Sequence, residues 1–297
     1  MDGLVVVDKP GGMTSHDVVA RVRRLARTRR VGHGGTLDPM ATGVLVVALG
    51  RATRLLTYIT GTEKGYTATV RLGQATLTDD AEGEVTATAP PEAVAAVTDE
   101  AIRGGMAALT GEIEQVPSAV SAVKIDGRRA YRRVRAGEQV ELPARRVTVS
   151  TFTAQAIRRD RPGFIDVDVT VACSAGTYVR ALARDLGAAL GVGGHLTALR
   201  RTYVGGFRLA EAVSLAELEE RAPHVVTMTM AEAARRTLPQ RQVTDEQARV
   251  LSHGGGLPPA GLSGPYAAFA PDGHVVAVLV ERKGRARPEV VLAPAGS

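Results

Sequence analysis

Hydrophobic and polar residues alternate in several short stretches of the chain, and this pattern predicts a protein rich in strands. Residues 4–8 are apolar and end in Lys-Pro-Gly-Gly, which is typical of a short strand followed by a turn. Residues 64–73 and 164–173 alternate cleanly, which predicts two half-buried strands. A continuous apolar run at residues 44–49 predicts a strand that is buried on both faces.

Three other stretches have the spacing of amphipathic helices. Thr14 and Asp17 form a capping box ahead of an apolar stripe that runs to residue 26. The pattern at residues 98–111 predicts a second helix, and a third is expected at residues 177–191, directly after Ser-Ala-Gly. Because the first turn of a helix favours anions, the start of the third helix could face a phosphate or a carboxylate.

Two segments depart from this alternating pattern. Residues 114–150 are basic, lack regular periodicity and are bounded by Pro117 and Pro143, so we expect an insertion that protrudes from the core. From about residue 240, Gly- and Pro-rich turns separate short apolar stretches, which predicts a small β-rich domain. We therefore predict an α+β protein with one domain at residues 1–238 and a second at residues 239–297.

The composition is that of an ordinary soluble protein, with 44% hydrophobic and 23% charged residues in 297. The longest apolar runs have the length of strands, and the N-terminus lacks the pattern of a signal peptide, so we expect a cytoplasmic protein without a membrane span. Cys173 is the only cysteine, which excludes an internal disulfide and a multi-cysteine zinc site. We interpret it as a small core residue.

The net charge of +6 is distributed unevenly. One basic cluster lies in the expected insertion and consists of Lys124, Arg128, Arg129, Arg132, Arg133, Arg135, Arg145 and Arg146. A second precedes residue 31 and consists of Arg21, Arg23, Arg24, Arg27, Arg29 and Arg30. Such clusters are typical of proteins that bind a polyanion such as nucleic acid, although arginines on solvated faces would give the same composition.

The stretch from Val31 to Leu55 contains the most distinctive candidate for chemistry. We expect His33 and Asp38 to lie in a glycine-rich loop directly before the buried strand. Pro39 disfavours helix at the residue before it, so the Asp38 carboxylate should stand at a corner of the backbone. Asp38 is therefore a candidate catalytic carboxylate, while an Asx turn in which it bonds only its own backbone is the alternative.

Several motifs, taken in order, resemble the TruB family of tRNA pseudouridine synthases. The stretch around the candidate carboxylate reads G-H-G-G-T-L-D-P-M-A-T-G-V-L, and the N-terminal motif reads V-V-D-K-P-G-G-M-T-S. Further matches are K-G-Y-T-A-T-V-R-L-G at residues 64–73, C-S-A-G-T-Y-V-R-A-L-A-R-D-L-G at 173–187 and H-L-T-A-L-R-R-T at 195–202. The resemblance spans roughly residues 1–205, with a departure at Leu77, where many relatives carry an acidic residue.

This resemblance implies a particular architecture. It implies a pseudouridine-synthase core with a mainly antiparallel, mixed central sheet flanked by helices. It also implies that residues 114–150 form an insertion that grips RNA. The C-terminal domain of the family varies and is often PUA-like.

The resemblance also implies roles for individual residues. Asp38 matches the essential catalytic residue, and Arg180 matches an arginine that pairs with it and favours its charged form. Tyr66 matches the aromatic residue that stacks on the flipped uracil. The expected substrate-binding residues are His33, Tyr178, Lys9, Leu199, Arg132 and Arg133.

The expected function is the conversion of a uridine in the T-loop of tRNA, at position 55, to pseudouridine after the base is flipped out. The carboxylate could attack C1′ of the ribose or C6 of the base, or remove a proton from the sugar, and the sequence leaves these routes open. We expect a monomer that acts on the T-arm of tRNA without a metal or other cofactor.

Two other functions compete with this one. The first is a non-catalytic protein that binds or folds tRNA on the same scaffold, against which the intact Asp38, Tyr66 and Arg180 argue. The second is a metal-dependent hydrolase that uses His33 and Asp38, but the sequence offers no further acidic or histidine residues at ligand spacing.

Overall fold

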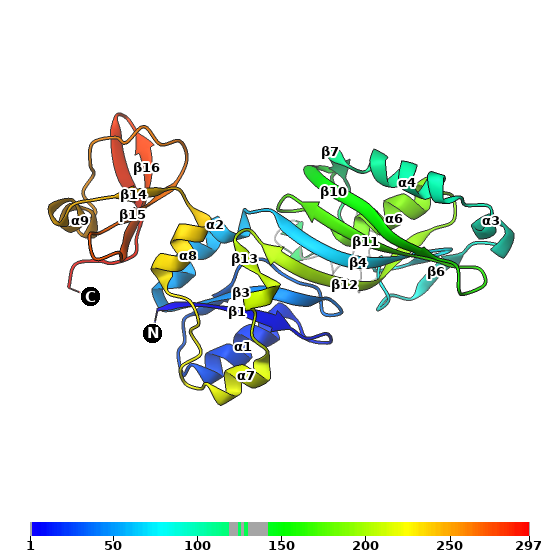
Figure 1. Ribbon diagram of the computed structural model, residues 1–297, viewed down its shortest axis with the longest axis horizontal. Coiled ribbons are helices and arrows are strands. Elements are labelled where there is room, and N and C mark those ends of the chain that lie inside the picture. Colours follow the sequence, from blue (N-terminus) through cyan, green and yellow to red (C-terminus); the bar gives the residue numbers. More distant parts are fainter. Residues whose placement is uncertain (1, 119–123, 126–127, 130–141, 297) are drawn as a thin grey trace. The chain divides into compact units, whose positions relative to one another are not determined.

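The computed structural model describes residues 2–118, 124–125, 128–129 and 142–296 (Figure 1). The chain forms two compact units. The first unit contains Met1–Pro39, Gly43–Thr62 and Tyr203–Ser297, and the second contains Met40–Thr42 and Glu63–Thr202. Arg132 and Arg133, which were predicted to bind RNA, lie outside the described residues.

The first unit combines the N-terminal strands with the C-terminal third of the chain. Its strands are β1 (Gly3–Lys9), β2 (Val31–His33), β3 (Thr42–Leu49), β13 (Phe207–Arg208), β14 (Gln240–Gln242), β15 (Tyr266–Phe269), β16 (Val275–Arg282) and β17 (Arg285–Val291). Its helices are α1 (Ser15–Leu25), α2 (Leu56–Thr60), α7 (Leu215–Glu220), α8 (Met230–Thr237) and α9 (Asp245–Ser252), with 3-10 turns η1 (Gly50–Leu55) and η2 (Leu209–Glu211).

Strands β1 and β3 pair antiparallel and serve two hydrophobic cores, one on each face. Val5 and Val7 pack with residues of α1 and α7, whereas Leu4 and Val6 pack with residues of α8 and of the C-terminal strands. This division follows from the period of two in a strand, which sends successive side chains to opposite faces. The predicted strand at 44–49 is confirmed, as is the capping box formed by Thr14 and Asp17 at the start of α1.

The C-terminal region contains a four-stranded sheet in the order β14-β15-β16-β17. This confirms the expected β-rich composition beyond residue 240, because β15, β16 and β17 lie close to the three predicted strands. The sequence analysis missed α9, which has a capping box formed by Thr244 and Gln247. Among its residues only Leu251 is fully buried, with Ala248 packed against the same core, so its apolar stripe is short.

The second unit is built around the middle of the chain. Its strands are β4 (Lys64–Leu72), β5 (Gln74–Thr76), β6 (Val85–Thr88), β7 (Gly111–Gln115), β8 (Lys124–Ile125), β9 (Arg128–Arg129), β10 (Arg145–Arg158), β11 (Ile165–Cys173) and β12 (Gly194–Val204). Its described helices are α3 (Pro91–Ala95), α4 (Asp99–Ala108) and α6 (Val179–Ala189).

Five strands of this unit form a continuous sheet in the order β12-β4-β11-β10-β7. Strands β4 and β11 pair antiparallel along their whole length, which confirms the two strands predicted from alternation. Helices α4 and α6 pack against each other and cover one face of this sheet (Figure 1). None of the helices in the described parts of the chain has the length and apolar character needed to span a bilayer.

The prediction that residues 114–150 lack regular structure is wrong at both ends. Strand β7 extends to Gln115, and the 14-residue strand β10 begins at Arg145. The two strands pair antiparallel over five residues, which satisfies their backbone groups. Val147 and Val149 are buried on one face of β10, but the arginines that precede them obscured this short alternation.

Candidate active site

Asp38 is half-buried, and the residue before it is held by Ser15. The Ser15 hydroxyl accepts a hydrogen bond from the Leu37 N–H at 2.8 Å and donates one to the Leu37 carbonyl at 3.1 Å. Ser15 is only 1% exposed, so water does not compete strongly for these bonds. The first residue of α1 therefore fixes both backbone groups of Leu37.

The residue after Asp38 is held from the same part of the chain. The Pro39 carbonyl accepts hydrogen bonds from the Gly12 N–H at 2.9 Å and from Lys9 Nζ at 3.1 Å. Lys9 Nζ also donates to the carbonyls of Pro10 at 2.8 Å and Met13 at 2.6 Å. Three carbonyls match the three N–H donors of an ammonium group. Lys9 is fully buried, so these contacts give it a bracing role, and its predicted contact with substrate stays a prediction.

His33 lies at the end of a strand and not in the loop where it was expected. In β2, His33 pairs with Val47 of β3, so the glycine-rich loop begins only after it. Its ring stands edge-on to that of His16, with the ring centroids 5.4 Å apart. Gly35 within the loop and Gly43 at the start of β3 both have φ of 97°, a conformation that favours glycine.

In the second unit, Arg180 is the second residue of α6 and is only 4% exposed. Its Nη1 donates to the Thr78 carbonyl at 2.7 Å and lies 3.5 Å from Oδ2 of Asp80, whose side chain is also 4% exposed. A guanidinium that is removed from water needs such partners. The sequence analysis did not assign this pairing.

The turn that carries Asp80 is itself held in place. The Asp80 carboxylate accepts hydrogen bonds from the Thr78 hydroxyl at 2.5 Å and from the Glu82 N–H at 3.1 Å. The Asp80 carbonyl accepts one from the Thr76 hydroxyl at 2.8 Å. Leu77, where the sequence departs from its relatives, is 48% exposed. These bonds orient the Asp80 carboxylate, and the exposed Leu77 side chain has no share in them.

The other predicted residues of the second unit come from three elements. Tyr66 is 7% exposed on β4, where it lies opposite Val171 of β11. Leu199 is also 7% exposed and lies on β12, the neighbour of β4 in the sheet. Tyr178 is half-buried and is the N-cap residue of α6, two positions before Arg180. Their roles toward substrate stay predictions.

Two other titratable groups lie on neighbouring strands of this unit. Burial and the charge of Arg201 lower the pKa of Lys64 to about 8. Burial raises the pKa of the Cys173 thiol to about 11, and the side chain is 1% exposed, which confirms it as a small core residue. The described residues contain no group of three or more His, Cys, Asp or Glu side chains arranged to hold a metal ion.

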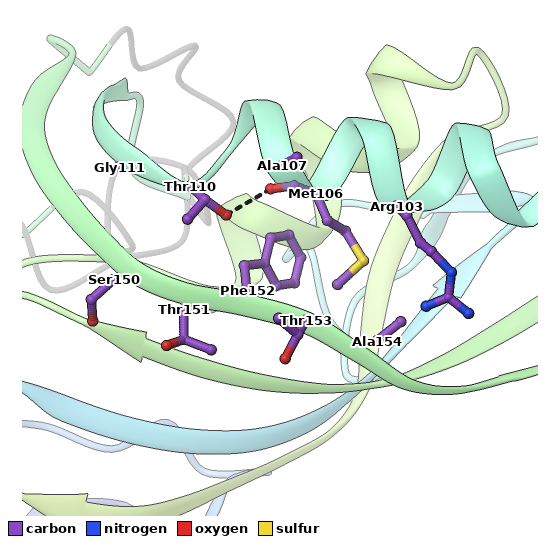
Figure 2. Close-up of a pocket in the computed structure, with 10 residues that line it drawn as sticks. All are labelled: Arg103, Met106, Ala107, Thr110, Gly111, Ser150, Thr151, Phe152, Thr153 and Ala154. Carbon is purple, nitrogen blue, oxygen red and sulfur yellow. Dashed lines mark hydrogen bonds between the residues drawn. The ribbon is translucent and has the colours of Figure 1, made fainter.

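A pocket of about 610 Å³ lies between α4 and β10. Figure 2 shows Phe152 and Met106 meeting between the two elements, with Arg103 at one end. The pocket is lined by Arg103, Met106, Ala107, Thr110, Gly111, Ser150, Thr151, Phe152, Thr153 and Ala154. None of the predicted site residues is among them, so this pocket is a separate feature of the second unit.

Three family models match consecutive parts of the chain. Residues 23–179 match the N-terminal domain of the TruB family pseudouridylate synthases. The chain belongs to the TruB family. Residues 180–238 match the tRNA pseudouridylate synthase B C-terminal domain, and residues 238–293 match the C-terminal domain of tRNA pseudouridine synthase II.

Curated relatives that match over nearly the whole chain agree with this membership. The tRNA pseudouridine synthase B of Arthrobacter sp. (strain FB24) is 57% identical, over 99% of this chain and 97% of its own. That of Thermobifida fusca (strain YX) is 58% identical, over 98% of this chain and 99% of its own.

Among solved structures, the archaeal box H/ACA sRNP Nop10-Cbf5 complex contains a chain that matches with a TM-score of 0.73. It is 28% identical, and the match covers 99% of this chain and 87% of that one. The expected α+β pseudouridine-synthase fold is therefore confirmed.

Proposed function

We propose that this protein converts a uridine of tRNA to pseudouridine, and that this uridine lies at position 55 in the T-loop. Membership of the TruB family supports the reaction, and the full-length relatives that are named tRNA pseudouridine synthase B support tRNA as the substrate. The observation that carries the proposal is the bracing of Asp38, because both of its neighbours are fixed by hydrogen bonds from residues 9–15.

The reaction breaks the bond between C1′ of the ribose and N1 of uracil and joins C1′ to C5. It needs no change of oxidation state. An ionised Asp38 can attack C1′ or C6, or remove a proton from the sugar, and each route needs the carboxylate at a fixed distance from the nucleotide. Fixing Leu37 and Pro39 supplies that precision without using the carboxylate itself.

Arg180 and Tyr66 complete the proposed catalytic set. The proposed role of Arg180 is to pair with the Asp38 carboxylate, and the support is its matched motif together with its burial as a charged group. Tyr66 stacks on the flipped uracil, and Tyr178, Leu199 and His33 line the nucleotide site. Flipping a base costs a few kcal/mol, which stacking and phosphate contacts offset.

The decisive experiment compares Asp38→Asn with the wild-type protein. Tritium release from tRNA labelled at C5 of uridine should be abolished, while affinity for tRNA stays within a few-fold. Asp160→Asn, in an exposed turn of the second unit, is the matched control and should be fully active. Measurable turnover by Asp38→Asn would disprove the assignment.

The site of modification is tested separately, by mass-spectrometric mapping of pseudouridine in tRNA from cells that lack the protein. Loss of pseudouridine at position 55 alone is the expected result. If purified protein binds tRNA and releases no tritium, the chain is a non-catalytic RNA-binding or RNA-folding protein instead.

The basic insertion is proposed to bind tRNA phosphates in the T-arm. Charge reversal at Arg132 and Arg133 should weaken binding and reduce the log-log salt slope by about one for each phosphate that is no longer neutralised. Arg103→Glu, on the exposed side of α4, serves as a control for a general change of charge. Unchanged salt slopes would show that Arg132 and Arg133 do not bind phosphates.

We also propose that the protein acts as a monomer in the cytoplasm. Light scattering after size-exclusion chromatography tests the first point, since a monomer has a mass of 31.1 kDa. Cell fractionation tests the second.

A further inference from the structure

Gln115 is the last residue of β7 and is only 2% exposed. Its side-chain amide bonds to the backbone of Tyr178 at both ends. Gln115 Nε2 donates to the Tyr178 carbonyl at 3.1 Å, and Gln115 Oε1 accepts from the Tyr178 N–H at 2.8 Å. The pair resembles the two hydrogen bonds that opposed residues exchange across an antiparallel sheet. One side chain thus fixes both polar groups of a residue 63 positions away.

Tyr178 is the residue from which α6 starts. As the N-cap it has extended backbone angles, φ −104° and ψ 109°, and its own side chain makes no capping hydrogen bond. Its carbonyl accepts the N–H of Leu182 at 3.2 Å, the bond that begins the helix. Gln115 therefore fixes the peptide groups on both sides of Tyr178, from which the first turn of α6 starts. Arg180 lies in that turn.

The segment that leads into α6, residues 174–178, is also held at its other end, by β10. The Ser174 hydroxyl accepts from the Thr148 N–H at 2.9 Å, and the Ser174 N–H donates to the Thr148 carbonyl at 2.8 Å. Between these two fixed ends lies Gly176, with φ of 88°. Without Gln115, the bonds at Ser174 would remain, and the Tyr178 end of this segment would lose both of its bonds to β7.

A second interaction joins the end of β7 to α6 one turn further along. Arg184 Nη2 donates to the Val116 carbonyl at 2.7 Å, directly after Gln115. Arg184 follows Arg180 by four positions, so both lie on one face of the helix. The end of β7 therefore contacts both the start of α6 and the face that carries Arg180.

We propose that Gln115 is a positioning residue for catalysis, which sets the place and direction of Arg180 through the backbone of Tyr178. The proposal rests on the proposed function of the site. Strand β7, which leads into the basic insertion, would thereby help to align the first turn of α6.

The first test uses Gln115→Met, which keeps much of the volume and removes both hydrogen bonds. The single-turnover rate of pseudouridine formation should fall by roughly 10- to 100-fold, the size of effect expected from a small displacement of a catalytic group. Affinity for tRNA should stay within about threefold, since the substitution leaves the basic residues unchanged. Gln155→Met, on the exposed side of β10, is the matched control and should behave as wild type.

A double-mutant cycle with Arg180→Lys separates positioning from general loss of structure. If Gln115 acts through Arg180, Gln115→Met should lower the rate of the Arg180→Lys protein by less than about threefold. The same fold loss in both backgrounds would overturn the proposal, and so would a folded Gln115→Met protein with the wild-type rate.

Gln115→Glu gives a second readout if the Met variant is poorly folded. A protonated Glu side chain can donate to the Tyr178 carbonyl and accept from its N–H, whereas the carboxylate can only accept. The rate of this variant, relative to wild type at each pH, should therefore rise as the pH is lowered. A constant ratio would contradict the proposal. Inactive wild-type protein would instead refute the proposed function.

Discussion

The two regions that carry the candidate catalytic residues are held in different ways. Around Asp38, the observed bonds act on the backbone of the neighbouring residues, through Ser15 on Leu37 and through Lys9 on Pro39. Around Arg180, Gln115 also bonds the backbone of Tyr178, but other bonds act on the Arg180 side chain itself, through the Thr78 carbonyl and the charge of Asp80. The bonds around Asp38 control the position of its carboxylate. The bonds around Arg180 control position and also compensate a buried charge. Substitutions in the two regions should therefore fail in different ways.

Among the substitutions that test how the two regions are held, the largest effect is expected when the charge of Arg180 is removed. Arg180→Met removes the charge proposed to act beside Asp38, so the single-turnover rate should fall by about 10²-fold or more. It also leaves the Asp80 carboxylate buried without this partner, which should lower stability. Arg180→Lys keeps a charge and loses the planar fork of the guanidinium, so its rate should lie between those of wild type and Arg180→Met. Thermal melting of both variants separates lost stability from lost chemistry. If Arg180→Met were as active as wild type near neutral pH, Arg180 would be a structural arginine only.

A smaller effect is expected when the backbone around Asp38 is released. Ser15→Ala leaves the N–H and carbonyl of Leu37 without this partner, which costs about 1–3 kcal/mol where such groups are buried. The single-turnover rate should fall roughly tenfold, with the pH dependence of wild type, because no charge is removed. Ser252→Ala, whose hydroxyl bonds only to its near neighbours Arg249 and His253 among the observed contacts, is the control. A changed pH profile for Ser15→Ala would contradict the view that the bonds around Asp38 control position and not charge.

The smallest effect on activity is expected at a charged pair away from both regions. Arg71 donates to both carboxylate oxygens of Asp166 across β4 and β11, at 2.8 and 2.7 Å. The pair lies five residues along the strand from Tyr66, roughly 17 Å away. Asp166→Asn should leave the rate unchanged and lower the free energy of unfolding by about 1–2 kcal/mol at pH 7.

The pH dependence of that loss follows from the pKa of Asp166. The hydrogen bonds and charge of Arg71 hold this pKa below its usual value in the folded protein. The pair therefore contributes fully above the unfolded pKa, about 3.9, and its contribution is lost as the pH falls through the folded pKa. Urea denaturation at pH 7 and near pH 3 should show the difference between Asp166→Asn and wild type shrinking. A constant difference would contradict the assignment.

The sequence predicted the elements whose signal is local. The alternation in β4 and β11 and the capping box of α1 each involve residues within one element, and all were confirmed. The strand at His33 was missed because its pairing with Val47 depends on a distant partner. The beginning of β10 was missed for a similar reason, since its partner β7 precedes it by thirty residues.

The interactions that hold the candidate site could not be predicted from the residues. The pairing of Arg180 with Asp80 and that of Gln115 with Tyr178 join positions far apart in the sequence, and neither pair has a local pattern. The resemblance to a family suggested which residues act, and the structure adds how some of them are held. The chemical roles of Asp38, Tyr66 and Arg180 remain predictions.

The two cores on opposite faces of β1 and β3 limit how the chain can change in length. Lys9 pairs with Gly43 at one end of this ladder, and Gly3 pairs with Leu49 at the other. A one-residue insertion within β3 would either send its later side chains to the wrong core or, if their register is kept, displace the Asp38 loop relative to Lys9. The turn at residues 283–284, between β16 and β17, is exposed and carries none of the interactions that hold Asp38 or Arg180. Length variation among natural or engineered versions of this protein should therefore be tolerated at that turn and rejected in β3.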